Sequence, residues 1–132
     1  MWGEVLGILL GLCVSEIERA RAAGKAGLLF DVDYQGARQI QEKFPHAVGV
    51  FILPPSMEEL RRRLESRGSD DAASRKRRFK KAREEIGHYP FFDYMIVNDD
   101  LQQALAELRG IVLAEGCRRW RVAAKAEALL KA

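Results

Sequence analysis

Apolar residues along this chain gather into short continuous runs separated by segments of helical spacing. Three runs have the pattern of strands buried on both faces: Ala26–Val32, His46–Leu53 and Tyr94–Val97. Between and after them, apolar side chains recur every three or four residues, as on one face of a helix. Strands that alternate with helices predict an α/β fold, with a three-layer, mostly parallel sheet and helices on both faces.

Polar residues that can cap helices stand before most of the helical patterns. A cap side chain accepts a hydrogen bond from a first-turn backbone N–H that the helix leaves unpaired. The candidate caps are Ser15, Ser56, Asp70 or Asp71, and Asp99 or Asp100. Ser56 has Glu59 three residues later, which makes a capping box. Gly24 is expected to end the first helix, and Pro45 to end the second, over Gly36–Phe44.

Positive charge is concentrated in one segment, although the whole chain of 132 residues carries a net charge of only +3. The range Arg61–Arg83 holds eleven Lys and Arg residues against three acids. Such a local field favours anions: nucleotide phosphates, nucleic acid or an acidic partner. The alternative is a solvated helix face, where most runs of charge are found. Binding of nucleic acid is disfavoured, because Phe79 is the one aromatic residue interleaved with these cations.

The cysteines and the apolar N-terminus indicate a cytoplasmic protein without a membrane span. Cys13 and Cys117 are far apart and match no metal or redox spacing, so two reduced thiols are expected. Trp2–Val14 is shorter than the roughly 20 residues that cross a bilayer and lacks the basic start of a secretory signal. Val5–Leu12 reads either as a strand that joins the sheet or as a helix for self-association, and oligomeric state stays open.

Three segments together resemble the guanylate kinase family. They are Asp31–Arg38 (DVDYQGAR), Val50–Asp70 (VFILPPSMEELRRRLESRGSD) and Lys81–Leu101 (KAREEIGHYPFFDYMIVNDDL). The similarity runs from about Ser15 to Glu115 and corresponds to the C-terminal part of that family. It implies a truncated core of a P-loop nucleotide kinase, with a single domain over residues 1–132 and a lid-like segment at about 61–83.

The resemblance also implies roles for five residues. Arg63, Arg67 and Arg78 resemble lid arginines that contact the phosphates of the two nucleotides. Asp33 resembles the carboxylate on the GMP and magnesium side, and Asn98 a residue of the loop that lies against adenine. Each has a structural alternative: Arg63 and Arg67 could balance acids such as Glu59 on one helix face, and Asp33 could be a helix cap.

The phosphate-binding loop of this family has no counterpart in the 132 residues. The pattern G-x-x-x-x-G-K-[ST] cradles phosphates with backbone N–H groups and a lysine. The one Gly-Lys pair, Gly24-Lys25, is followed by Ala26. The passage at Glu4–Ser15, which is polar in the family around its GMP site, is apolar at Ile8, Leu10 and Leu12.

These observations predict a truncated or redesigned guanylate kinase core that does not transfer phosphate from ATP to GMP on its own. Weak binding of GMP, ATP or phosphate is expected, with no bound metal and no certain cofactor. Magnesium would accompany ATP if kinase activity is retained. Two alternatives stay open: a functional guanylate kinase, and a non-catalytic module that binds acidic or phosphorylated partners.

Overall fold

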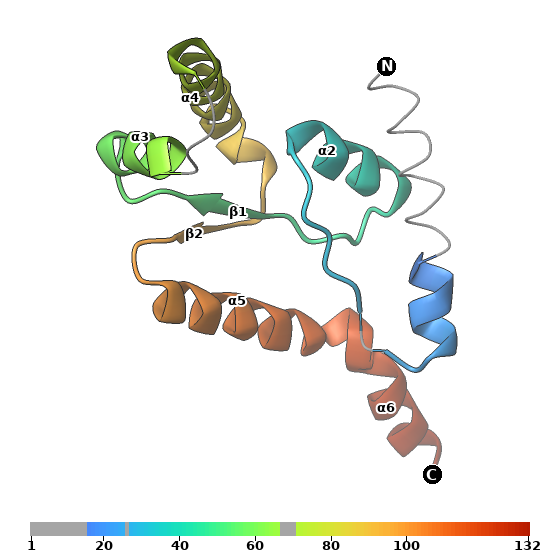
Figure 1. The fold of residues 1–132 in the computed structure, drawn as a ribbon. Helices are drawn as coiled ribbons and strands as arrows, with labels where there is room; N and C mark the ends of the chain where they lie inside the picture. Colours follow the sequence, from blue (N-terminus) through green and yellow to red (C-terminus); the bar gives the residue numbers. More distant parts are fainter. Residues whose placement is uncertain (1–15, 26, 67–70) are drawn as a thin grey trace.

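The computed structural model describes residues 16–25, 27–66 and 71–132. A helical segment covers residues 16–22, and the other elements follow in the order α2, β1, α3, α4, a 3-10 turn, β2, α5 and α6 (Figure 1). Their bounds are Tyr34–Lys43 (α2), Val50–Leu53 (β1), Met57–Ser66 (α3), Ala72–Ile86 (α4), Tyr89–Phe91 (the 3-10 turn), Tyr94–Val97 (β2), Leu101–Gly116 (α5) and Arg119–Lys131 (α6).

The described strands form a parallel pair with helices on both sides. β1 and β2 align with Val50 opposite Tyr94 and Leu53 opposite Val97. Figure 1 shows α5 along the β2 side of the pair and α2, α3 and α4 on the β1 side. Parallel strands need a long crossover, which here contains α3 and α4. The predicted α/β class is confirmed, and β2 has the predicted bounds, whereas the run His46–Leu53 forms a strand only from Val50 onward.

Within the first predicted strand, Ala26–Val32, the described residues 27–32 do not form a strand. Residues 27–32 carry no strand assignment, and 26 lies outside the described residues. Leu28, Leu29 and Val32 are 40, 77 and 41% exposed, whereas a strand buried on both faces was expected. A strand requires a neighbour for its ladder hydrogen bonds. In the described part of the chain β1 pairs only with β2, and no strand pairs with residues 27–32.

Four caps hold the helix starts: Ser56, Asp71 and Asp100 as the sequence predicts, and Asp33, for which a cap was the structural alternative. Aspartate carboxylates accept from backbone N–H groups at α2, α4 and α5, and the Ser56 hydroxyl accepts from Glu59 N at 3.0 Å. The aspartate bonds are Asp33 to Gly36 N at 2.9 Å, Asp71 to Ser74 N at 2.8 Å and Asp100 to Gln103 N at 2.9 Å. Gly24, at φ 69°, adopts the left-handed conformation that ends the first helix.

The buried core is small and lies between β2 and α5. Ile96 and Ala104 are 1 and 7% exposed. Leu101 and Val112 of α5 are 67 and 52% exposed, so the buried face of this helix is the one that carries Ala104. Small Ala104 lets the helix approach β2, and Leu108 and Ile111, partly buried, follow it on the same face.

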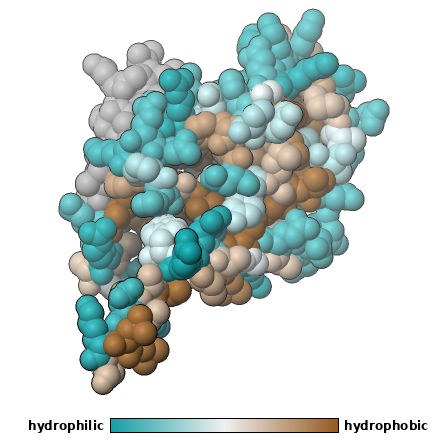
Figure 2. Space-filling model, turned by 180° about the vertical axis from the view of Figure 1, so that it is seen from behind, coloured by the Kyte–Doolittle hydropathy of each residue, from teal (hydrophilic) through white to brown (hydrophobic). Residues whose placement is uncertain are grey.

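Much apolar surface remains exposed. Figure 2 shows apolar side chains across the middle of one face and at the protruding end of α6. Leu129 and Leu130 in α6 are 78 and 82% exposed. None of the described helices is long and apolar enough to cross a membrane. The expectations for Val5–Leu12 fall outside the described residues.

Candidate functional site

An open cleft of about 500 Å³ lies where α2, α3 and α4 meet. Leu64 and Ala82 are its apolar lining residues. Its charged residues are two acids and two cations: Asp33, Glu85, Arg78 and Lys81. Two of the five residues singled out in the sequence, Asp33 and Arg78, therefore line one cavity, although they are far apart in the chain.

Asp33 is held at the cleft by the start of α2. Its Oδ1 accepts the hydrogen bond from Gly36 N and caps the helix. Gly36 is buried, and a Cβ there would lie 2.9 Å from Val32 Cβ and 3.3 Å from Asp33 Oδ1. Only glycine allows this close approach, so the local sequence fixes where the carboxylate stands.

Glu85 ties the end of α4 to the start of α2. Its Oε2 accepts a 3.2 Å hydrogen bond from Tyr34 N, at the positive end of the α2 dipole. The Tyr34 ring stacks on His88, with centroids 3.7 Å apart, and meets Phe91 edge-on at 5.3 Å. These contacts give His88 a structural role and join the end of α4 to the start of α2.

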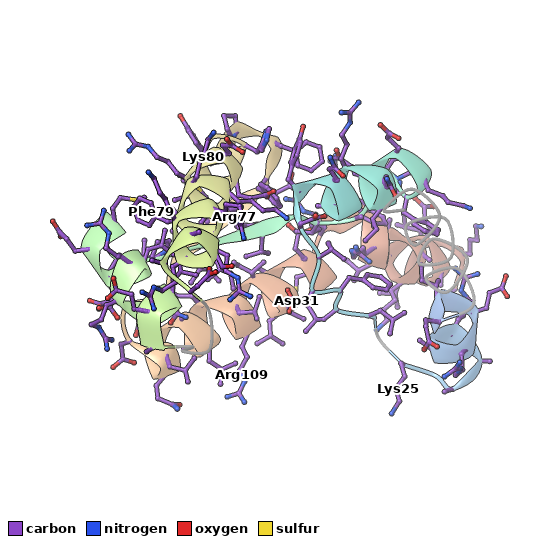
Figure 3. All side chains as sticks on the ribbon, turned by 45° about the horizontal axis from the view of Figure 1, so that its top comes forward. Lys25, Asp31, Arg77, Phe79, Lys80 and Arg109 are labelled. Carbon is purple, nitrogen blue, oxygen red and sulfur yellow. The ribbon has the colours of Figure 1, made fainter. Side chains whose placement is uncertain are left out.

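The cations of the cleft come from α4. Arg78 and Lys81 are three residues apart and lie on the same side of the helix. Figure 3 shows Arg77 and Lys80 projecting from this helix and Phe79 on its α3 side. There the guanidinium of Arg61 lies over the Phe79 ring, 4.9 Å from its centroid, and joins α3 to α4. An arginine and a lysine at one cavity wall are suited to bind phosphate oxygens.

Arg63 and Asn98 form a second contact, which does not line the cleft. Arg63 Nη1 donates to the Asn98 backbone oxygen at 2.9 Å, and its Nε donates to Glu59 Oε1 at 2.8 Å. The pairing with Glu59 was the structural alternative for Arg63 in the sequence. The bond to Asn98 carried no sequence signal, because the two residues are 35 positions apart. Arg67 lies outside the described residues.

Sequence reasoning missed Lys81 and Glu85 as lining residues. Both follow Arg78 at helical spacing, three and seven residues later, and this periodicity could have found them. Among the described residues, no group of three or more His, Cys, Asp and Glu side chains could hold a metal ion.

Comparison with known proteins identifies the family. The sequence model described as guanylate kinase matches residues 1–115. The guanylate kinase of Geobacter sulfurreducens is 48% identical over 121 residues, which are 92% of this chain and 59% of that protein. The Myxococcus xanthus guanylate kinase is 47% identical over 122 residues, 92% of this chain and 58% of its own length.

A solved structure agrees with these relatives. The crystal structure of guanylate kinase from Anaplasma phagocytophilum is similar with a TM-score of 0.56 and 37% identity, over 68% of this chain and 41% of that one. The chain thus spans less than two thirds of the length of the relatives it matches. From the family match over most of its residues, the chain belongs to the guanylate kinase family.

Proposed function

We propose that this chain is a nucleotide-phosphate-binding part of a guanylate kinase core, and that on its own it does not transfer phosphate from ATP to GMP. The observation that carries the proposal is the shared cleft of Asp33 and Arg78. The relatives of this chain are guanylate kinases. The chain carries one side of a phosphate site, with cations from α4 and a carboxylate from α2.

Phosphoryl transfer depends mainly on positioning and on neutralising charge. Arg78 and Lys81 supply positive charge at the cleft, while Asp33 and Glu85 offset part of it. The phosphates of ATP require more than this, and no G-x-x-x-x-G-K-[ST] loop occurs in the 132 residues. The expected outcome is weak phosphate binding without catalysis.

The remaining assignments follow from the family. Residues at about 61–83 act as the lid, and Arg63, Arg67 and Arg78 contact nucleotide phosphates. The loop at Asn98 lies against adenine, and magnesium enters only as part of the substrate MgATP. The position of Arg63 beside Asn98 supports a common nucleotide-facing role for these two residues.

Two measurements test the proposal on the purified chain. Calorimetric titration with MgATP and with GMP, separately and together, is expected to show weak binding that does not saturate at micromolar concentrations. A coupled assay for ADP production is expected to stay at the blank rate, with the Geobacter sulfurreducens enzyme as the positive control. Micromolar affinity for both nucleotides with ADP production would mean that the chain is a functional guanylate kinase, and the proposal would be wrong.

A further inference from the structure

Glu59 stands at the centre of three charge-assisted hydrogen bonds on α3. It accepts from Arg62 Nη2 at 2.6 Å and Arg62 Nε at 2.8 Å, and from Arg63 Nε at 2.8 Å. Its side chain is 23% exposed, whereas that of Arg62 is 69% exposed. Glu59 is therefore the inner partner, with one arginine on the solvent side and the other turned toward the body of the protein.

Arg63 carries this contact across to another element. Its side chain is 34% exposed, and its Nη1 donates to the Asn98 backbone oxygen at 2.9 Å. The guanidinium is thus fixed at two separate nitrogens, Nε by Glu59 and Nη1 by Asn98. Because the group is planar and rigid, two such bonds define its orientation. They use two of its five N–H donors, so the bridge by itself is compatible with anion contact at the others.

We propose that Glu59 is a positioning residue that holds Arg63 as a bridge between α3 and the loop after β2. Glu59 fixes Nε, and this directs Nη1 to the Asn98 carbonyl. Without the carboxylate, the long arginine side chain regains its other rotamers and the bridge is lost. The functional value of the bridge rests on the proposed role of Arg63 in phosphate binding, because a preoriented guanidinium binds an anion at lower entropic cost.

The neighbouring residue of α3 shows why orientation matters here. Leu64 turns into the cleft, while Arg63 turns to the Asn98 loop. The bridge therefore ties the helix that forms one wall of the cleft to the carboxyl end of β2. An exposed ion pair on a helix contributes little to stability. The contribution of Glu59 to the free energy of unfolding is accordingly expected to be small, and the orientation of Arg63 is the property that tests its role.

The test is solution NMR of the full ¹⁵N-labelled chain without ligand. Arg63→Lys identifies the Arg63 Nε–H signal by its disappearance. In Glu59→Gln, exchange of that proton with water is expected to be about tenfold faster, since a hydrogen bond to a charged group is lost. The backbone amide signals of residues 98–100 are expected to shift. The matched control, Glu58→Gln, removes an exposed charge one position earlier and should change neither.

Two outcomes would overturn the proposal. In the first, Glu59→Gln and Glu58→Gln have the same Arg63 Nε–H exchange rate and the same amide signals at residues 98–100. The other is a shift spread along all of α3, which would make Glu59 a determinant of the helix rather than of Arg63. The Ser56 cap uses the backbone N–H of Glu59 and persists in the variant. The NMR experiment contains no nucleotide, so its result can be interpreted even if calorimetry contradicts the proposed function.

Discussion

The hydroxyl of Tyr94 donates a 2.6 Å hydrogen bond to Glu115 Oε1 and so joins β2 to the last turn of α5. Glu115 is only 8% exposed, and Arg118 Nε donates to its other oxygen at 2.7 Å. The hydrogen bonds from Arg118 and Tyr94 lower the pKa of Glu115 below its usual value. The same bond raises the pKa of Tyr94, because the carboxylate favours the protonated phenol. Each oxygen of the buried Glu115 carboxylate thus has a hydrogen-bond donor, at the point where α5 ends and α6 follows.

Removal of this hydroxyl is expected to destabilise the chain. Tyr94→Phe keeps the ring and leaves Glu115, a buried carboxylate, with one donor fewer. Thermal unfolding should show a lower Tm for this variant. Tyr89→Phe is the control, since Tyr89 is 51% exposed, and its Tm should equal that of the parent. Equal Tm values for both variants would contradict a role of the Tyr94 bond in stability.

Ile96 is expected to be the most sensitive apolar position among the described residues. At 1% exposure it fills the core between β2 and α5, and Ile96→Ala should cost about 2–5 kcal/mol in the free energy of unfolding. Val97 follows it on the same strand, points to the opposite face and is 52% exposed. Val97→Ala should therefore cost well under about 1 kcal/mol. Urea denaturation measures the free energy of unfolding of both variants. A similar loss at the two positions would contradict the placement of Ile96 in this core.

The two adjacent aspartates before α5 differ in role, because Asp100 is the cap of this helix. Asp100 accepts from Gln103 N at 2.9 Å, so Asp100→Ala should cost about 1 kcal/mol of unfolding free energy. Asp99→Ala removes the same charge from the residue before it and should change stability little, and Asp100→Asn should preserve most of the cap. A larger loss in Asp99→Ala than in Asp100→Ala, by urea denaturation, would contradict the assignment.

Glu59 is expected to make stability depend on acid pH. The hydrogen bonds from Arg62 and Arg63 lower the pKa of Glu59 from 4.5 to about 2. A carboxylate whose pKa is depressed in the folded state contributes stability above its unfolded pKa and loses it as the pH falls. The difference in urea midpoint between the parent and Glu59→Gln should therefore shrink as the pH falls from about 4.5 to about 2. Glu58→Gln, which removes the same charge from the exposed residue one position earlier, is the control. An equal pH dependence in that variant would show that Glu59 has no particular role.

Arg78 is expected to contribute to phosphate binding, and Arg77 is not. Arg78 lines the cleft, whereas Arg77 is absent from its lining and donates to Ser74 Oγ at 3.0 Å on its own helix. With pyrophosphate as the probe, Arg78→Ala should weaken binding about tenfold, the size of one charge-assisted hydrogen bond. Arg77→Ala removes the same charge and is the control. An equal loss of pyrophosphate affinity in both variants, measured by calorimetry, would indicate a general effect of positive charge rather than a binding site.

Local signals in the sequence predicted most of the helices. Ser56, Asp71 and Asp100 cap within three residues of their partners, so the information needed is adjacent in the chain. The first predicted strand failed for the opposite reason. A run such as residues 27–32 is apolar whatever lies beside it, and only a hydrogen-bonded neighbour makes it a strand.

The candidate site was predictable in part. The placement of Asp33 depends on a cap and a glycine nearby in sequence, and that of Arg78 on helical spacing. Whether Arg63 faces the cleft or the Asn98 loop depends on how α3 packs beside β2, which no local pattern encodes. The family resemblance singled out all four residues. Only the tertiary arrangement shows that Asp33 and Arg78 line the cleft, whereas Arg63 and Asn98 bind each other.

The parallel pairing of β1 and β2 has a kinetic consequence. It joins segments far apart in the chain: at its start Gly49 N donates to Asp93 Oδ2 at 2.8 Å, across 44 positions. Closing a flexible loop of that length costs entropy that grows with the logarithm of its length. Helices form in about 0.1–1 μs without such closure. α3 and α4 can therefore form first and shorten the flexible chain between β1 and β2. The rate of sheet formation is then set by how fast the two strands come together.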